Sequence, residues 1–496
     1  MAISMDLMKV STFGSVEASD DSLLRKSFQN HPAYTSIKEM DSFLVAGRKG
    51  SGKTAIFMRL IEEAETDDDI QVIAHTFDDY PWPHHERQAV EGVPAERRYL
   101  QSWIYLILIG VARLVLKDVQ TERLDEEQFN NYERMRAFVQ DAYGKTNPDF
   151  SQVFQPLKKK FRLDLLFKPT PVVEAGIKEV EPRELPVYFS QVNKEMMGAL
   201  ISILNQDKKY FVCFDEIDLG FDSSSREHSD RLAGLLLAAR EVFRTARRAG
   251  KHLNPVVFLR SDILNDLDFE DKNKITSELT SYVMWNEDDQ FNLRQLMEAR
   301  FGALDGGDSV LVDWRKVFDE GQKIGQQSKY SYILQRTMMR PRDIIKYCNM
   351  TLAEYKKGSS RGNIFSNEHV LGARSAYSSY LKGEISDEIK RHFDHGEKLF
   401  DLIRSIGYEK FTLDDLKGAI ESKGYGSLFS ADDAIEVMFD FSIVGYTKTG
   451  GARAGSTSVM KYKDPEATLD RSKVRFFVHP GLKEALSLKG EYKKSE

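Results

Sequence analysis

Cysteine is nearly absent from this chain of 496 residues, which contains only Cys213 and Cys348. Two thiols are too few for a disulfide framework or a thiolate metal site, and so low a number favours a reducing compartment. Positive charge is not in excess either, because the formal net charge at pH 7 is −7. This balance argues against a broadly basic protein that coats nucleic acid or a membrane surface, and it allows at most a local basic patch.

A hydrophobic run long enough to span a membrane is also missing. The most apolar segment, residues 103–112, has about half of the ~20 residues that a spanning helix needs. Because Arg113 follows it, we expect a buried helix. Residues 1–11 are mixed in polarity and lack the apolar core of a secretory signal. The sequence therefore predicts a cytoplasmic protein without a membrane partner.

Among the features that are present, the most informative is a phosphate-binding loop (Walker A) at residues 47–54. An apolar run, residues 43–46, leads into it as a strand, and a helix-periodic stretch, residues 55–61, follows it. Glycines in such a loop let backbone N–H groups surround a triphosphate at a helix N-terminus, whose dipole favours anions. In this pattern Lys53 reaches the β- and γ-phosphates and the Thr54 hydroxyl ligates Mg²⁺. The expected nucleotide-binding residues here are Gly47, Arg48, Lys49, Gly50, Ser51, Gly52, Lys53, Thr54 and Ala55.

A second motif follows the apolar residues 211–214, which predict a central strand of the sheet. Asp215 comes directly after them, at the strand end where ligands bind in such sheets. We expect Asp215 to hold the water shell of Mg²⁺, which is the Walker B role, and Glu216 to polarise a water for attack on the γ-phosphate. A buried strand that merely ends in an acidic turn is the structural alternative, and the upstream phosphate loop makes it the weaker one.

Two arginines are candidates for sensing the γ-phosphate. Arg260 ends the apolar run 256–259, and its forked donors suit a phosphate oxygen. Arg340 precedes Pro341, which is well suited to a first helical turn. An arginine at that position could close a helical lid onto the nucleotide. A surface arginine at a strand end and a solvated helix start are the respective alternatives.

The order of elements predicts an α/β fold, namely a P-loop domain with a parallel sheet, then an all-helical lid, then a winged helix. Strand candidates at 43–46, 70–77, 210–214, 255–259 and 281–285 alternate with helical sequence, which favours a parallel sheet covered on both faces. The expected domains are an N-terminal segment at 1–40, the P-loop domain at 41–290 with an irregular insertion at about 143–195, the lid at 291–385 and the winged helix at 394–490.

These features together resemble the AAA+ superfamily of P-loop ATPases, particularly its STAND-like and origin-recognition-like branches. The shared parts are the loop 47–54, the acidic run 215–218, Arg260, and residues 340–342 before the C-terminal winged helix. The resemblance implies ATP and Mg²⁺ as cofactors and a homo-oligomer. It also implies an arginine supplied in trans, for which Arg244, Arg247 and Arg248 are candidates, although a solvated helix end is the simpler interpretation.

The start of the chain is similar to a group of bacterial ATPases found in phage-defence and mobile loci. The residues concerned are Phe13-Gly14, Asp20-Asp21 and the loop 47–55. This resemblance implies a switch ATPase that acts with a partner effector protein in antiphage defence. No nuclease, deaminase or cyclase motif stands out in the sequence, so the effector would be another chain.

Two rival functions remain open at this point. One is a DNA-acting ATPase of the replication-initiator or transposition-regulator type, and the other is an ATP-binding scaffold with negligible turnover. The second helix expected in the winged helix, residues 430–440, carries four acidic residues and no basic one. Recognition helices need groups that face bases and phosphates, so any nucleic-acid binding is expected not to be sequence-specific. The presence of Glu216 argues against the scaffold.

Overall fold

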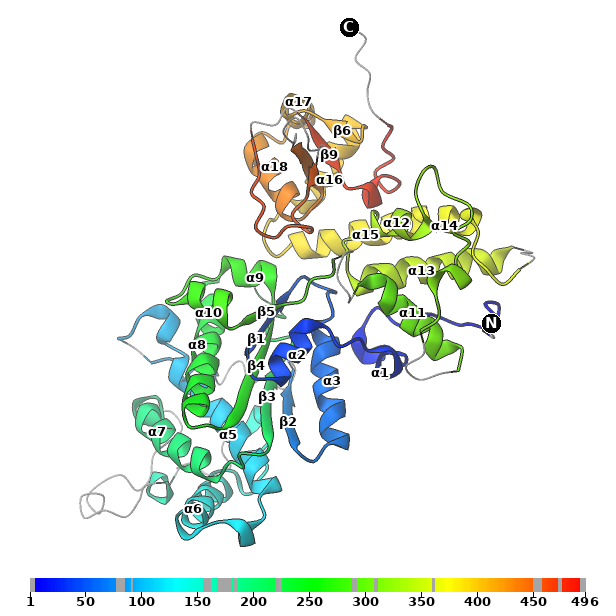
Figure 1. Ribbon diagram of the computed structural model, residues 1–496. Helices are drawn as coiled ribbons and strands as arrows, with labels where there is room; N and C mark the ends of the chain where they lie inside the picture. Colours follow the sequence, from blue (N-terminus) through cyan, green and yellow to red (C-terminus); the bar gives the residue numbers. More distant parts are fainter. Residues whose placement is uncertain are drawn as a thin grey trace. The chain divides into compact units, whose positions relative to one another are not determined.

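The computed structural model describes residues 5–76, 85–90, 92–154, 162–166, 181, 185–219, 221, 225–286, 292–306, 311–358, 362–448, 457–471 and 475–490. The chain forms two compact units (Figure 1). One is Asn30–Val283, and the other combines Met1–Gln29 with Met284–Glu496. The finer domain boundaries drawn from the sequence stay a prediction.

A five-stranded parallel sheet forms the centre of the unit Asn30–Val283. Its strand order is β2-β3-β4-β1-β5, so β4 lies between the strand that leads into the phosphate loop and the strand that Asp215 follows. The predicted α/β fold with a parallel sheet and a helical region after it is confirmed. The strands are β1 Leu44–Gly47, β2 Ile70–His75, β3 Lys209–Phe214, β4 His252–Arg260 and β5 Thr280–Tyr282.

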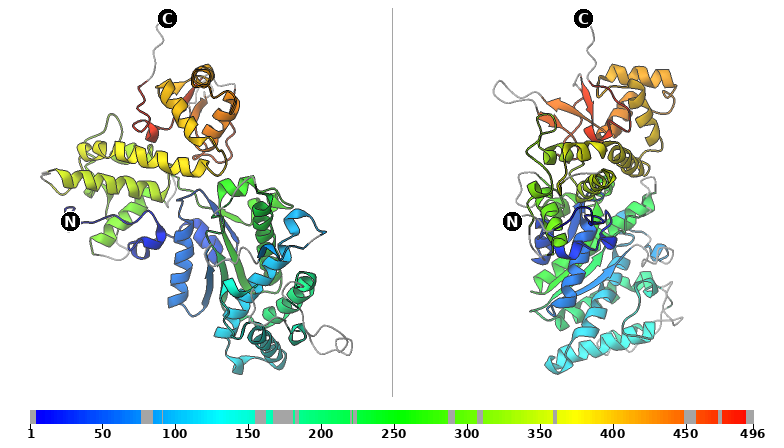
Figure 2. Two further views of the ribbon diagram at one scale, coloured as in Figure 1. Left: turned by 180° about the vertical axis from the view of Figure 1, so that it is seen from behind. Right: turned by 90° about the vertical axis from the view of Figure 1, so that its right-hand side faces the viewer.

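Helices cover both faces of this sheet (Figures 1 and 2). On one face, α3 contacts β1, β2 and β4, and its Phe57 ring meets Phe258 of β4 edge-on at 5.7 Å. On the other face, α5 packs on β2 and β3 and α8 packs on β4. The helices of this unit are α2 Pro32–Lys38, α3 Lys53–Thr66, α5 Leu100–Asp118, α6 Glu126–Tyr143, α7 Leu185–Ile203, α8 Arg226–Arg248, α9 Ser261–Asp266 and α10 Lys272–Glu278.

The apolar segment 103–112 is the middle of α5, the central helix of the core. Among the described residues, one helix, Ala95–Asp118, is long and apolar enough to cross a membrane by length and composition alone. Its most apolar window is 83% buried inside the protein, where α5 contacts α7, α8 and the sheet. The prediction of a buried helix is confirmed, because the apolar surface of α5 is covered by protein.

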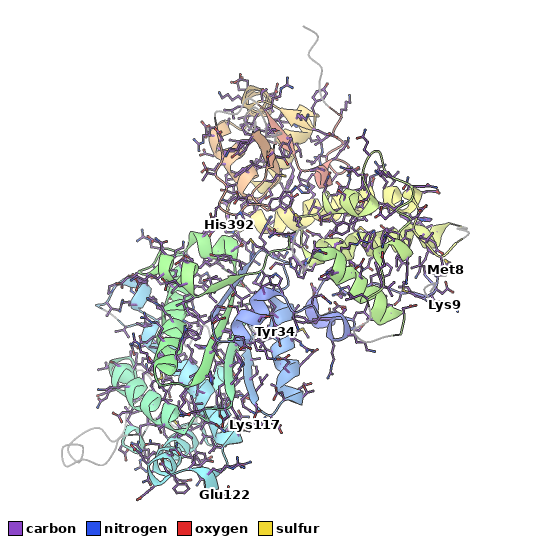
Figure 3. All side chains as sticks on the ribbon, in the orientation of Figure 1. Met8, Lys9, Tyr34, Lys117, Glu122 and His392 are labelled. Atoms are coloured by element: carbon purple, nitrogen blue, oxygen red, sulfur yellow. The ribbon has the colours of Figure 1, made fainter. Side chains whose placement is uncertain are left out.

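Short helix α2 fixes the approach of the chain to β1. Tyr34 of α2 (Figure 3) is buried, and burial, together with the nearby Glu63 carboxylate of α3, raises the pKa of its phenol. Lys38 forms an ion pair of 2.8 Å with the same carboxylate. Asn254 of β4 donates to the carbonyl of Ser42 at 2.8 Å. These contacts hold α2 beside the helix that begins at Lys53.

The first described residues of the chain belong to the helical unit. Phe13 is fully buried and meets Phe301 at 5.2 Å, and the buried carboxylate of Asp21 pairs with Arg300 at 2.6 Å. The N-terminal residues contribute to the core of these helices through the buried side chains of Met5, Leu7, Val10 and Phe13. The helices here are α1 Leu24–Ser27, α11 Leu293–Leu304, α12 Lys329–Leu334, α13 Pro341–Lys357, α14 Asn367–Gly372 and α15 Arg374–Ile389.

The C-terminal part has three helices and a four-stranded antiparallel sheet of order β6-β9-β7-β8. That this part is a winged helix stays a prediction. The acidic residues of α18 have local roles: Asp433 forms a capping box with Ser430, and Glu436 pairs with Arg471 at 2.6 Å. The elements are α16 Gly396–Ile406, β6 Lys410–Phe411, α17 Leu413–Lys423, α18 Ala431–Asp440, β7 Val444–Lys448, β8 Thr457–Val459 and β9 Phe476–Val478.

Candidate nucleotide-binding site

The loop between β1 and α3 has the backbone that its glycines permit. Gly50 and Gly52 have φ values of 77° and 110°, in the left-handed region that side chains disfavour. A Cβ added to Gly47 would lie 2.5 Å from the Ser51 hydroxyl. Gly52 is the N-cap of α3, and no side chain among the described residues caps this helix. The N–H groups of its first turn are therefore suited to an anionic ligand.

The Lys53 side chain folds back onto the backbone of the loop. Its ammonium donates to the carbonyls of Gly47 at 2.9 Å and Arg48 at 3.2 Å. Desolvation lowers the pKa of Lys53, while the carboxylates of Asp218 and Asp215 oppose this shift. The ammonium therefore lies between the loop carbonyls and the acidic end of β3, which is the position from which a lysine can reach bound phosphates.

Asp215 and Thr54 meet across the gap between β3 and α3. The Asp215 carboxyl is 3% exposed, and burial raises its pKa to about 7, although its hydrogen bond with the Thr54 side chain and the charge of Lys53 lower it. Its Oδ2 atom has no hydrogen-bond partner among the described residues. A buried carboxylate oxygen without a partner, next to a hydroxyl, fits the oxygen ligands that Mg²⁺ prefers.

Glu216 turns away from the strand directly after Asp215. Its φ is 59°, a left-handed conformation that costs a residue other than glycine about 1–3 kcal/mol. The side chain is exposed, whereas Asp215 and Ile217 on either side of it are buried. This strained turn presents a second carboxylate at the open edge of the sheet, on the solvent side of Asp215, where a water can reach it.

Arg260 belongs to the same edge of the sheet. It is the last residue of β4 and is in register with Gly47, the first residue of the loop. Its guanidinium is 7% exposed and pairs with Asp262. The charge of Arg260 adds to the lowering of the Lys53 pKa by burial, and it opposes the raising of the Asp218 pKa by burial. A sensing role for Arg260 stays a prediction.

Asp218 is a member of the site for which the sequence pattern predicted no role. It is 6% exposed, and burial raises its pKa while the charges of Lys53 and Arg260 lower it. Its carboxylate is thus part of the electrostatic environment of the loop lysine. The available signal was its place in the acidic run 215–218, but a residue in a turn after a strand can point in any direction.

The two residues expected in the lid lie in the other compact unit. Pro341 is the first residue of α13, as a proline at a helix start should be. Arg340 is 2% exposed and donates to Asp343 at 2.8 Å and to Glu388 at 2.8 Å. Two carboxylates therefore already neutralise this guanidinium, and its contact with a phosphate stays a prediction.

The structure describes only some of the other basic residues that the sequence suggests as phosphate contacts. In the insertion expected at 143–195, the run Lys158-Lys159-Lys160 is a candidate phosphate or RNA contact by its charge, or a solvated face, and it lies outside the described residues. The wing expected at about 448–463 includes Arg453, which lies outside them as well, and Lys461, which donates to the carbonyl of Ala467 at 2.8 Å. The trans candidates Arg244, Arg247 and Arg248 are exposed at the end of α8.

Comparison with known proteins adds one family model and several distant relatives. Residues 291–386 match the model of the FunZ-associated C-terminal helical domain. A curated relative, the putative transposon gamma-delta 80.3 kDa protein of Escherichia coli K12, is 22% identical over 412 residues. The alignment covers 80% of this chain and 54% of the relative, so the chain spans about half the length of the curated relative that it matches.

Two similar solved structures contain DNA. The Aeropyrum pernix Orc1 protein in complex with DNA is 14% identical with a TM-score of 0.35, and the match covers 95% of this chain and 94% of that one. Drosophila ORC bound to DNA is 10% identical with a TM-score of 0.26, covering 86% and 80%. At such low scores the fold assignment rests on the sheet order and loop geometry given above. By that geometry the unit Asn30–Val283 has a P-loop nucleotide-binding fold, and the helices that follow it include the match to the FunZ-associated domain.

Proposed function

We propose that the chain is an AAA+-type ATPase in which binding and hydrolysis of ATP drive a change of conformation or assembly. The observation that carries this proposal is the meeting of Thr54 and Asp215 beside Lys53, with one buried carboxylate oxygen left without a described partner. A hydroxyl, a carboxylate and an ammonium from distant parts of the sequence are the groups that nucleotide hydrolysis uses, and their proximity supports the proposal.

Each residue has a distinct task in this scheme. The N–H groups at the start of α3 and the Lys53 ammonium bind the phosphates, and Lys53 exchanges its loop carbonyls for phosphate oxygens. Thr54 and Asp215 would hold Mg²⁺, which neutralises charge on the phosphates. Glu216 orients a water in line with the γ-phosphate and accepts its proton. Arg260 senses the γ-phosphate by exchanging Asp262 for a phosphate oxygen.

The switch itself is supported by resemblance and by the charges of the helical unit. Arg340 can report the γ-phosphate only by leaving Asp343 and Glu388, so nucleotide binding would be coupled to a rearrangement at the start of α13. We extend the proposal to a homo-oligomer that acts with a partner effector in bacterial antiphage defence. The resemblance to STAND-like ATPases and to those of defence loci is the support for this setting.

A DNA-acting ATPase is the second candidate, and one observation favours it. The curated relative is described as a transposon protein, and transposition regulators act on DNA. The helix α18 offers acidic side chains that are used in capping and ion pairs, so this candidate needs a DNA-binding surface elsewhere on the molecule.

Steady-state phosphate release tests the proposal, with Glu216→Gln as the diagnostic variant. We expect wild-type protein to hydrolyse ATP in the presence of Mg²⁺ and Glu216→Gln to lose at least about 100-fold in kcat while still binding ATP, because general-base contributions reach about 10²–10⁴. The matched control is Glu122→Gln, which changes an exposed carboxylate on a short helix of the same unit.

Added DNA separates the two candidates in the same assay. A rate that rises several-fold with DNA would favour the DNA-acting ATPase, and an unchanged rate would favour the effector switch. Wild-type turnover no faster than that of Glu216→Gln would contradict the ATPase proposal altogether and support a nucleotide-binding scaffold.

A further inference from the structure

Four arginines form a row along the C-terminal half of α8. Arg240, Arg244, Arg247 and Arg248 are spaced by four, three and one residues, so their side chains leave the helix on adjoining faces. The row from Arg240 to Arg248 extends about 12 Å along the helix axis at ~1.5 Å per residue. We call these four residues the α8 arginine row.

Three members of the row make no ion pair or side-chain hydrogen bond within the part of the chain that the structure describes. Arg244, Arg247 and Arg248 are all exposed, and no described carboxylate lies within ion-pair distance of them. Arg240 differs, because it pairs with Asp271 of the segment before α10 at 2.8 Å. One end of the row is therefore fixed, and the other end presents three uncompensated positive charges.

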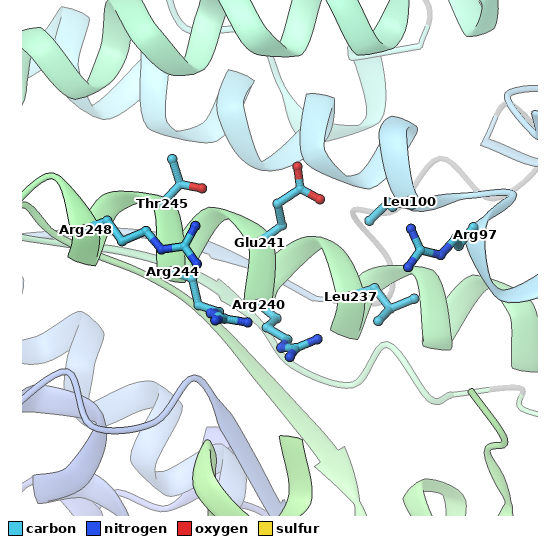
Figure 4. A pocket seen from close by; sticks show the side chains of 8 residues that line it. All are labelled: Arg97, Leu100, Leu237, Arg240, Glu241, Arg244, Thr245 and Arg248. Carbon is cyan, nitrogen blue, oxygen red and sulfur yellow. The ribbon is translucent and has the colours of Figure 1, made fainter. Parts of the chain in front are cut away.

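Two cavities border the row and share Arg240, Arg244 and Arg248. The smaller, of about 200 Å³, has four arginines and one carboxylate, Glu241, in its lining (Figure 4). The larger, of about 520 Å³, has five cationic side chains and one carboxylate, Glu278. The smaller cavity adds Arg97, which pairs with Glu270 at 2.6 Å. The larger cavity adds Arg247 and Lys274, and Lys274 pairs with Asp271 at 2.5 Å.

This concentration of charge is not explained by the helix alone. Cations at a helix C-terminus are favoured by the macrodipole, which accounts for Arg247 and Arg248 in the last turn. Arg244 lies one turn earlier, and like charges four residues apart destabilise a helix by about 0.2–0.5 kcal/mol per pair. The chain as a whole carries a net charge of −7, so the row is not a sample of a generally basic surface. An anionic partner would relieve this repulsion.

We propose that the α8 arginine row binds the phosphate backbone of a nucleic acid without reading its sequence. Guanidinium forks donate two parallel hydrogen bonds to a phosphate, and a row of about 12 Å matches about three to four steps of one strand at ~3.4 Å each. Phe243, the aromatic residue among these lining residues, is 1% exposed, so its ring is not available to stack on a base. The surface can therefore bind phosphates through charge and hydrogen bonds, without stacking on bases.

This inference deepens the DNA-acting candidate above, since it names the surface and the partner, and it does not require ATP turnover. The arginines lie on α8, which precedes β4, whereas the nucleotide loop lies between β1 and α3. DNA binding and ATP hydrolysis therefore use different residues within one copy of the chain, and separate assays measure them.

The test is fluorescence anisotropy of a labelled duplex DNA of random sequence with the full chain, over a range of salt concentrations. The variant is Arg244→Gln/Arg247→Gln/Arg248→Gln. The matched control, Arg136→Gln/Arg315→Gln/Lys390→Gln, removes the same charge from exposed residues that pair with Glu133, Asp313 and Asp387 elsewhere. Glu216→Gln is measured alongside, and thermal melting of every variant checks that it is folded.

We expect the arginine-row variant to weaken DNA binding at least about tenfold at low salt. Its log–log salt slope should fall by about 0.9 for each phosphate that the variant no longer neutralises, while the control and Glu216→Gln bind as wild type does. Wild-type protein could bind DNA through the arginine row and yet not hydrolyse ATP. That result would contradict the ATPase proposal and would still support DNA binding by the row.

Three results would overturn the inference. The first is wild-type protein that does not bind DNA. The second is an arginine-row variant that binds DNA as tightly as the control variant does. If the ATPase rate of that variant also no longer depends on protein concentration, the row acts on the nucleotide bound to a second copy of the chain. The third is displacement by poly-glutamate at the same charge concentration as DNA, which would assign the row to an acidic protein.

Discussion

At the scale of single residues, Asp215 is the most consequential side chain of the nucleotide site. It is 3% exposed and its pKa is raised to about 7, chiefly by burial. A carboxyl whose pKa is raised in the folded state destabilises that state at high pH, and this penalty disappears as pH falls from above 7 toward the value of the unfolded chain, near 4. A cation beside the Asp215 carboxylate would therefore stabilise its ionised form.

This predicts that Asp215→Asn stabilises the nucleotide-free protein at pH 8 and has little effect at pH 4–5. The gain has an upper bound of about 4 kcal/mol, at ~1.4 kcal/mol per pKa unit. Thermal unfolding at the two pH values measures it, with the exposed Asp41→Asn as control. The sign should reverse when ATP and Mg²⁺ are added, because only wild type retains the metal ligand. An Asp215→Asn protein that is less stable than wild type at pH 8 without ligand would contradict this account.

At the scale of elements, the N-terminal residues and the helices that follow Met284 make one core from the two ends of the chain. The Phe13 ring lies against Phe301 at 5.2 Å and Phe365 at 6.1 Å. Next to it, Asn349 of α13 accepts from the backbone N–H of Phe13 at 2.8 Å. Since residues 5–13 and the helices α11 and α13 share a hydrophobic cluster, they should unfold together.

Phe13→Ala is therefore expected to destabilise the helical unit by about 3–5 kcal/mol, the usual cost of deleting a buried aromatic ring. Urea unfolding followed by far-UV circular dichroism measures the shift in midpoint. Met8→Ala is the control, because Met8 is 53% exposed in the same segment and should change the midpoint little. Equal midpoints for Phe13→Ala and wild type would show that the N-terminal segment is not part of this core.

At the scale of the whole molecule, two compact units carry the parts of the proposed switch. The loop, Asp215, Glu216 and Arg260 belong to Asn30–Val283, and Arg340 belongs to the unit that includes Met284–Glu496. A nucleotide that engages residues of both units would favour one arrangement of them over the others. The proposed oligomer would couple that choice to assembly.

Light scattering with and without ATP and Mg²⁺, on wild type and Glu216→Gln, tests the assembly part of the proposal. We expect a larger, discrete species with ATP, and we expect it to persist in Glu216→Gln because that variant retains the γ-phosphate. Lys53→Ala, which removes the ammonium of the loop, should show the nucleotide-free mass in every condition. One unchanged mass for wild type throughout would exclude nucleotide-driven assembly and leave a fixed oligomer or a monomeric switch.

The sequence by itself determined the local parts of this protein. Short-range patterns decide whether a strand, a glycine loop or a helix forms, so residues 43–61 and 211–218 predicted the loop, its helix and the strand that ends at Asp215. The alternation of strands and helices predicted the parallel sheet, and the apolar run 103–112 predicted a buried helix, for the same reason.

Only the tertiary structure decided which distant residues meet. Strand order places β4 between β1 and β3, and this brings Arg260 beside Gly47 and lets Asp218 act on Lys53. Packing of apolar side chains, which no local pattern encodes, joins residues 5–13 to the helical unit. Whether a charged side chain has a partner also depends on long-range packing. On the same helix, Arg240 pairs with Asp271, whereas Arg244 is exposed.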